Sequence, residues 1–175
     1  EMHRRGASKC VGIDINGLFV EKFRDSAEGN SQIQAHTGDM GRMEYSAFSD
    51  QFDLAYSRDT IYYLTDVEIE HFFSGVFSIL NTGGFLVIQF IEADLLIDEN
   101  RKGKDSLRFR PDMFESSQAG RIHDESNPIR FLDPDLVNNI AVQEGLSLLD
   151  FKTHIQSYST YDSLFRVDKY LLFVK

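Results

Sequence analysis

The sequence of 175 residues contains one cysteine, no tryptophan and three prolines. A single Cys10 excludes an internal disulfide, which fits the reducing cytosol and predicts a cytoplasmic protein. Cys10 lies in an apolar run, so we expect it to be buried filler rather than a nucleophile. The longest apolar stretch, Phe85–Ile91, is interrupted by Gln89 and is too short to span a bilayer. Residues 1–10 are polar and basic, so we expect neither a secretory signal nor a membrane partner.

Positive charge is also scarce. The chain has 18 Lys and Arg against 28 Asp and Glu, which gives a formal net charge of -10. A duplex-binding protein needs a basic surface to displace counterions, so the charge argues against a nucleic-acid partner. The length and the hydrophobic share of 42% predict one globular domain over residues 1–175. We therefore expect a small-molecule partner.

Strand-like and helix-like segments alternate over the first half of the chain. Strands are expected at Cys10–Asp14, Ile33–His36, Phe52–Tyr56 and Phe85–Ile91, and helices at Leu18–Ala27 and Asp66–Leu80, with one helical turn in Met43–Phe48. The first helix has Leu18, Phe19, Phe23 and Ala27 spaced for one apolar face. Thr65 or Asp66 should cap the second helix. This order predicts an α/β fold with a three-layer αβα, doubly wound, mostly parallel sheet, in which Phe85–Ile91 is covered on both faces.

The alternation breaks after Ile91. Residues 92–127 form a long, weakly periodic insertion that predicts either a substrate lid or a solvated insertion or oligomer contact. A helix is expected from Asp133 or Pro134 to Glu144. The last strands, Ser147–Ser157 and Phe165–Lys175, are too close in sequence for a crossover helix, so they must be antiparallel. We expect the final strand to lie beside Phe85–Ile91.

Polar residues follow three successive strands: Asp14, then Gly38-Asp39-Met40, then Ser57-Arg58-Asp59. Each has a simpler explanation, because Asp14 could cap a helix, Asp39 could begin a turn and Arg58 and Asp59 could be a solvated pair. The carboxyl ends of parallel strands meet at one edge of a sheet, where ligands of such folds bind. The three strand ends together therefore predict one ligand crevice, for which we expect no metal.

These segments resemble motifs of class I S-adenosylmethionine-dependent methyltransferases. "VGIDIN" resembles the second-strand motif, whose acid binds the ribose hydroxyls, and "GDM" resembles the third-strand motif, whose acid accepts from the adenine amino group. "FDLAYSRDTIYYL" and "LNTGGFLVIQF" resemble the fourth-strand motif and the glycine turn before the fifth strand. The resemblance implies S-adenosylmethionine as cofactor. It implies cofactor-binding roles for Asp14, Ile15, Asp39, Met40, Ser57 and Arg58.

The family's glycine-rich first motif is absent, since no G-x-G pattern precedes Asp14. In dinucleotide-binding folds the glycine loop precedes this acid by about 20 residues. We therefore expect a fragment without the first strand, in which Glu1–Arg5 is the tail of a helix that ends at Gly6. Such a fragment should bind the cofactor poorly, and its exposed apolar strand edge should invite pairing with another chain, including a second copy.

The implied activity is methyl transfer to a small polar acceptor, with an amine favoured because "SRDTI" resembles a segment of N-methyltransferases acting on phosphoethanolamine-type amines. Asp59, Tyr62 and His123 are the catalytic candidates, since an acid, Tyr or His can take the acceptor's proton. Tyr62 and Tyr63 are equally suited to the core, and Arg108 and Arg110 are candidate acceptor contacts. Two alternatives stay open: a catalytically inactive partner subunit and a nicotinamide-dependent oxidoreductase domain.

Overall fold

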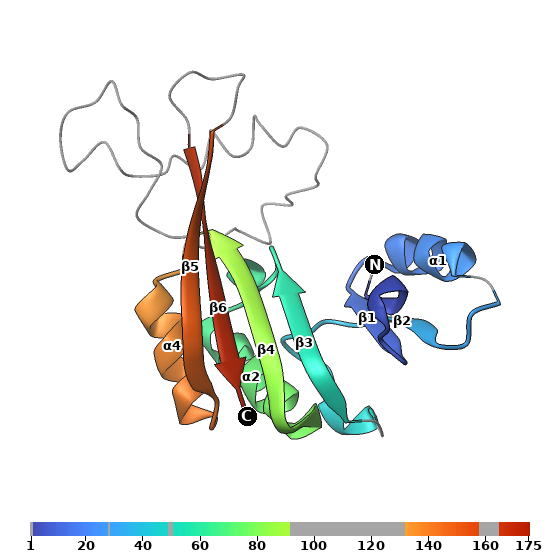
Figure 1. Ribbon diagram of the computed structural model, residues 1–175, viewed down its shortest axis with the longest axis horizontal. Helices are drawn as coiled ribbons and strands as arrows, with labels where there is room; N and C mark the ends of the chain where they lie inside the picture. The colour runs from blue at the N-terminus through green and yellow to red at the C-terminus, as the bar shows by residue number, and fades with distance from the viewer. Residues whose placement is uncertain (1, 28, 49–50, 92–131, 158–164) are drawn as a thin grey trace. The chain divides into compact units, whose positions relative to one another are not determined.

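The computed structural model describes residues 2–27, 29–48, 51–91, 132–157 and 165–175 (Figure 1). The chain divides into two compact units, Glu1–Glu44 and Tyr45–Lys175. The described strands form two sheets, one in each unit, rather than the single sheet expected from the sequence. That the whole chain acts as one domain stays a prediction.

The first unit contains a two-stranded parallel sheet and one long helix. Strands β1 (Cys10–Asp14) and β2 (Ile33–Thr37) pair in parallel, and α1 (Gly17–Ser26) connects them. A short 3-10 helix, η1 (His3–Arg5), ends at Gly6, whose φ of 99° suits glycine. The helical turn and its glycine terminator are therefore found where the sequence predicted them.

Helix α1 leaves most of its apolar face exposed. Val20 is its buried residue, whereas Leu18, Phe19 and Phe23 are 68%, 60% and 46% exposed. The spacing predicted one apolar face, and Phe19 and Phe23 of that face line one groove together. Periodicity reports which side chains share a face, and a partner for that face is a separate requirement.

The second unit contains a four-stranded mixed sheet in the order β3-β4-β6-β5 (Figure 1). Its strands are β3 (Phe52–Arg58), β4 (Leu80–Ile91), β5 (Ser147–Ser157) and β6 (Phe165–Val174). β3 and β4 are parallel, and β6 runs antiparallel between β4 and β5. The predicted insertion of the reversed last strand beside β4 is confirmed.

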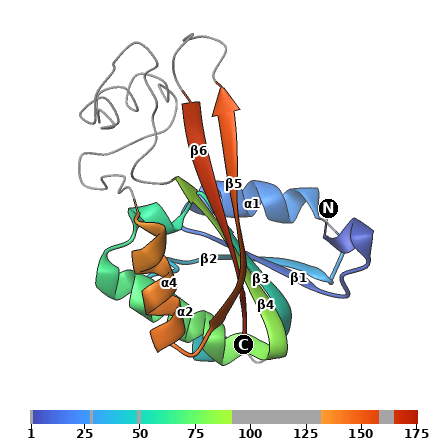
Figure 2. The same ribbon diagram turned by 60° about the vertical axis from the view of Figure 1, so that its left-hand side comes forward.

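Two helices cover one face of this sheet, α2 (Asp66–Ile79) and α4 (Pro134–Gln143), and they lie side by side (Figure 2). Of the two caps that the sequence offered for α2, Thr65 is the one found, in a capping box with Glu68, and Asp133 caps α4. Alternate residues of β4, namely Leu86, Ile88 and Phe90, are fully buried on the helix face.

The opposite face of the four-stranded sheet is more open. Phe85 of β4 is 41% exposed, and its neighbours Leu54 and Tyr56 of β3 are 45% and 46% exposed. The expectation that β4 is covered on both faces is therefore wrong for Phe85. Gln89 is the exception on this open face, because it is only 2% exposed.

Lys175 joins the end of the chain to the end of α2. Its Nζ donates to the carbonyl oxygens of Phe77 (2.7 Å) and Leu80 (2.8 Å) and lies 4.4 Å from the centre of the Phe77 ring. The last carbonyls of a helix have no partner within the helix and carry partial negative charge. The ammonium group therefore caps α2 and fixes it to the sheet through the strand that precedes Lys175.

The insertion predicted for residues 92–127 lies outside the described residues. No helix among the described residues is both long and apolar enough to cross a membrane.

Gly75 in the middle of α2 lets the ring of Tyr45, in the 3-10 helix η2 (Tyr45–Ala47), lie directly on the helix. A Cβ atom at this position would overlap the ring, and Tyr45 is only 6% exposed. We expect Gly75→Ala to destabilise the protein by about 1–3 kcal/mol, despite the better helix propensity of alanine. Urea unfolding should show this loss, and an unchanged midpoint would contradict the packing. Ser74→Ala on the exposed side of the same helix is the control and should change stability by less than about 0.5 kcal/mol.

Candidate functional site

Asp14 is the last residue of β1, and its side chain is exposed. Its Oδ1 accepts the backbone N–H of Asn16 at 2.7 Å, and Oδ1 of Asn16 in turn accepts from Leu18 N–H at 3.0 Å. Asn16 is thus the N-cap of α1. The simpler explanation of Asp14 as the helix cap is therefore wrong, and its carboxylate lies at the strand end, where a ligand could reach it.

Asp39 lies two residues beyond the end of the neighbouring strand. Parallel pairing places Asp14 opposite Thr37, and Gly38 N–H donates to Asp14 O at 3.0 Å. Asp39 Oδ1 accepts from Gly41 N–H at 2.9 Å, and its backbone oxygen accepts from Met43 N–H at 2.8 Å. Asp39 therefore begins a turn and at the same time follows a strand end adjacent to Asp14. The turn explanation and the ligand explanation are compatible.

Residues next to these two acids are apolar and accessible. Ile15 is 69% exposed and Met40 is partly exposed. A groove of about 240 Å³ runs between α1 and the sheet and is lined by Asp14 together with mostly apolar side chains, Ile13, Phe19, Val20, Phe23 and Ala35. A carboxylate on an apolar groove is an arrangement suited to a ligand that has both a hydroxylated and a flat apolar part.

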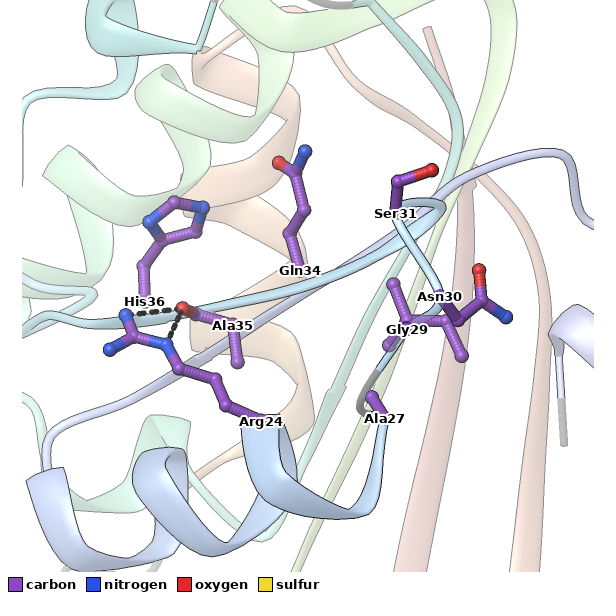
Figure 3. A pocket seen from close by; sticks show the side chains of 9 residues that line it. Arg24, Ala27, Gly29, Asn30, Ser31, Gln34, Ala35 and His36 are labelled. Carbon is purple, nitrogen blue, oxygen red and sulfur yellow. Dashed lines mark hydrogen bonds between the residues drawn. The ribbon is translucent and has the colours of Figure 1, made fainter.

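A larger, open groove of about 540 Å³ lies at the other edge of the first unit (Figure 3). Arg24 crosses it and donates from Nε and Nη2 to the backbone oxygen of Ala35, at 2.8 and 2.6 Å. Arg24 thereby satisfies an outward-facing carbonyl of the edge strand β2. None of the predicted site residues lines this groove, so we assign it no ligand.

The third strand end lies in the second unit. Ser57 is buried, and its Oγ lies 2.5 Å from Oγ1 of Thr60. Arg58 is largely exposed, and its Nε lies 3.4 Å from Oδ2 of Asp59. Asp59 has a φ of 53°, a left-handed conformation that is uncommon outside glycine. Its N–H donates to the backbone oxygen of Gln89 at 3.1 Å, which fixes the turn to β4.

The remaining catalytic candidates lie elsewhere. Tyr62, in the 3-10 helix η3 (Ile61–Tyr63), is 2% exposed and packs in the core, and its catalytic role stays a prediction. Tyr63 is partly exposed and packs against it, with ring centres 4.7 Å apart. His123, Arg108 and Arg110 lie outside the described residues. No cluster of three His, Cys, Asp or Glu suited to a metal occurs within the described part of the chain.

Two residues of this region were missed from the sequence. Oη of Tyr56 donates to Oε1 of Gln89 at 3.3 Å, and Gln89 is buried. The available signal was a single polar residue inside the apolar run Phe85–Ile91, which was interpreted only as an interruption. A buried amide must be hydrogen-bonded, so its position in the strand indicated a polar partner nearby.

Comparison with known proteins adds to this geometry. Residues 1–84 match the family model described as a methyltransferase domain. The resemblance to S-adenosylmethionine-dependent methyltransferases is thus confirmed over residues 1–84, just under half of the chain. The match covers β1, α1, β2, β3 and α2 and ends within β4. A comparison with curated protein sequences finds no match.

Solved methyltransferase structures share the fold. An S-adenosylmethionine-dependent methyltransferase from Mesorhizobium loti is similar with a TM-score of 0.64 and 16% identity, covering 97% of this chain and 82% of that one. The N-methyltransferase NodS from Bradyrhizobium japonicum, in complex with S-adenosyl-L-homocysteine, has a TM-score of 0.60 and 15% identity, covering 95% and 66%. This chain spans just under two thirds of the length of NodS. The predicted α/β, Rossmann-like methyltransferase fold is confirmed.

The left-handed conformation of Asp59 leads to a testable prediction. A left-handed conformation costs an L-residue about 1–2 kcal/mol and costs glycine almost nothing. We expect Asp59→Gly to be more stable than Asp59→Ala by about that amount, since both lose the carboxylate and differ in backbone preference. Urea unfolding of the two variants measures the difference. Equal stabilities would show that Asp59 is not held in this conformation.

Proposed function

We propose that this protein transfers the methyl group of S-adenosylmethionine to a small polar acceptor, with an amine as the favoured class. The proposal is supported by the methyltransferase-domain match over residues 1–84 and by one observation above all: Asp14 ends β1, and Asp39 closely follows the end of its parallel partner β2. The activity of the whole protein is part of the proposal, because the chain is shorter than NodS.

The first unit would hold the adenosine part of the cofactor. The carboxylate of Asp14 would accept from both ribose hydroxyls while Asn16 keeps it oriented through its backbone N–H. Asp39 would accept from the adenine amino group, and Ile15 and Met40 would provide apolar contacts. Ser57 and Arg58 of the second unit are the further cofactor-binding candidates, as the resemblance implies.

The chemistry requires little covalent participation by side chains. The cofactor, when bound, supplies an activated methyl electrophile on its sulfonium, so the chain's residues would mainly orient the acceptor and exclude water. An ammonium group must lose a proton before its nitrogen lone pair can attack. Asp59 is the candidate that takes this proton, since its side chain is only 18% exposed and directly follows the end of β3.

The amine class rests on two features of the second unit. An acceptor with a positive charge is favoured by the Asp59 carboxylate and by the strongly negative net charge of -10. The segment "SRDTI" also resembles N-methyltransferases for phosphoethanolamine-type amines, and NodS is an N-methyltransferase. The acceptor itself stays part of the proposal.

Binding of S-adenosylhomocysteine, followed by NMR titration, tests the cofactor role of Asp14. Losing a charge-assisted hydrogen bond costs about 1.5–3 kcal/mol, so Asp14→Asn should weaken binding roughly 10–150-fold. Asparagine keeps an oxygen for the Asn16 N–H, so the turn should survive. Because the glycine-rich motif is absent from this sequence, we expect weak binding even by the unaltered chain, which NMR still detects.

The matched control is Asp25→Asn, on the exposed surface of α1, which should leave the affinity unchanged. Equal affinities for Asp14→Asn and the unaltered chain would overturn the assignment of Asp14. Preferential binding of NADH over S-adenosylhomocysteine would instead favour the nicotinamide-dependent alternative. No shift of any resonance with S-adenosylhomocysteine at about 10 mM would contradict the proposed function.

A further inference from the structure

The carboxyl end of β3 carries three side chains that share the open face of the second unit. Tyr56 and Arg58 are two residues apart on β3, so their side chains project from the same face of the sheet. Oδ2 of Asp59 lies 3.4 Å from Nε of Arg58. The carboxyl end of β3 thus carries a guanidinium paired with a carboxylate and, two residues earlier on the same face, a phenol; we call these three residues the β3 corner.

Gln89 of the neighbouring strand contacts this corner twice. It is the register partner of Arg58, and its backbone oxygen accepts from Asp59 N–H at 3.1 Å. Its side-chain Oε1 accepts from Tyr56 Oη at 3.3 Å. Gln89 lies opposite Arg58, which is two residues further along β3 than Tyr56. The bond to Gln89 therefore tilts the Tyr56 phenol towards the carboxyl end of β3. The two contacts together fix the ring of Tyr56 and the backbone of Asp59.

Gln89 is a polar residue in a buried, otherwise apolar part of β4. It is 2% exposed in a strand whose other described residues from Phe85 to Phe90 are apolar. Burying an amide costs free energy that its hydrogen bonds only offset, so an apolar residue of the same shape would stabilise the strand at least as well. A buried amide is therefore informative about what its hydrogen bonds hold in place. The bond that Gln89 makes with Tyr56 holds a side chain that is 46% exposed and so contributes little to the core.

We propose that Gln89 is a positioning residue that orients Tyr56 and Asp59 for the acceptor, and that the β3 corner binds a zwitterionic amine. The Tyr56 ring and the Asp59 carboxylate would take the ammonium end, since aromatic faces and carboxylates both attract cations. The Arg58 guanidinium, whose side chain is 61% exposed, would take the acidic end, and this role would replace the cofactor contact that the resemblance implies for Arg58. This inference rests on the proposed function and adds to it the residues that select the acceptor.

The opposing charges at the corner decide the ligand class. Arg58 next to Asp59 partly neutralises the carboxylate, so a simple cation gains less here than a ligand that also satisfies the guanidinium. A simple anion would face the Asp59 carboxylate. A molecule with an ammonium and an acidic group a few atoms apart satisfies both.

Phosphoethanolamine, compared with ethanolamine, is the probe, and its binding to the unaltered 175-residue chain is followed by NMR titration. Asp59→Asn should weaken phosphoethanolamine binding by about 10–150-fold, as for a charge-assisted hydrogen bond. Arg58→Gln should weaken phosphoethanolamine binding but strengthen ethanolamine binding slightly, because it removes the cation that partly neutralises Asp59. No binding of phosphoethanolamine at about 10 mM, or tighter binding of ethanolamine, would overturn the proposed ligand class.

The positioning role is tested by a double-mutant cycle. Gln89→Met keeps the shape and removes the acceptor for Tyr56, and Tyr56→Phe removes the donor, so each should weaken phosphoethanolamine binding by about 5-fold. The double variant should be no weaker than either single variant, since both remove one shared bond. If the double variant instead weakens binding by the product of the two single effects, Gln89 and Tyr56 act independently and the proposed coupling is wrong.

Two further measurements separate positioning from folding and from the cofactor role. Gln51→Met is the matched control, because Gln51 lies just before the other end of β3 and its Nε2 donates to Ser78 O at 3.4 Å. It should leave phosphoethanolamine binding unchanged. Gln89→Met should keep the urea midpoint and the affinity for S-adenosylhomocysteine. If the unaltered chain does not bind S-adenosylhomocysteine, the proposed function is refuted. If it does, and Gln89→Met alone changes that affinity, the positioning role of Gln89 is refuted.

Discussion

Parallel pairing of strands is the constraint on which the candidate sites depend. Antiparallel neighbours would place successive strand ends at opposite edges, whereas β1 with β2 and β3 with β4 both run in parallel. Asp14 thereby comes to lie opposite Thr37, close to Gly38 and Asp39, and Arg58 comes to lie beside Gln89. Residues that are far apart in the sequence become neighbours through backbone hydrogen bonds alone. The side chains at these ends are then available for ligands, because backbone hydrogen bonds and packing along the rest of each strand hold the sheet together.

The reversed strand β6 has a different task. It pairs with β4 along seven residues and brings Lys175 to the end of α2. Sheet and helix are thus fixed to each other at the edge opposite the β3 corner, through an ammonium group on two helix carbonyls. Together with the fully buried Leu86, Ile88 and Phe90, this makes the strand beneath the corner rigid. A rigid strand allows Gln89 to act on its neighbours with a fixed geometry.

Much of this arrangement could be predicted from the sequence, since it depends on local signals. Thr65 and Glu68 mark the start of α2, the short link before β6 requires an antiparallel pair, and acids after apolar runs mark strand ends. Features that depend on distant partners could not be predicted. The spacing of Phe19 and Phe23 gives one helix face but does not say that the face stays exposed. Tyr62 was a catalytic candidate because it lies close to Asp59 in the sequence, and the sequence does not show that its side chain is buried.

The role of Gln89 also could not be predicted from the sequence. Its partner Tyr56 lies 33 residues earlier in the sequence, and only the strand register brings the two together. The backbone of Asp59 is similar, because its left-handed conformation follows from a bond to a strand that comes later in the chain. Residue types could therefore indicate a polar strand end, and the structure was needed to show how it is held.

The central claim is that the end of β1 and the turn after β2 together bind the adenosine part of S-adenosylmethionine. Backbone amide NMR shifts on addition of S-adenosylhomocysteine test it most directly, since they locate a weakly bound ligand residue by residue. The account predicts the largest shifts at Asn16, Gly38 and Gly41, whose N–H groups lie around the Asp14 and Asp39 carboxylates. Shifts confined to the groove lined by Arg24, Asn30 and His36, with none at those three amides, would contradict it.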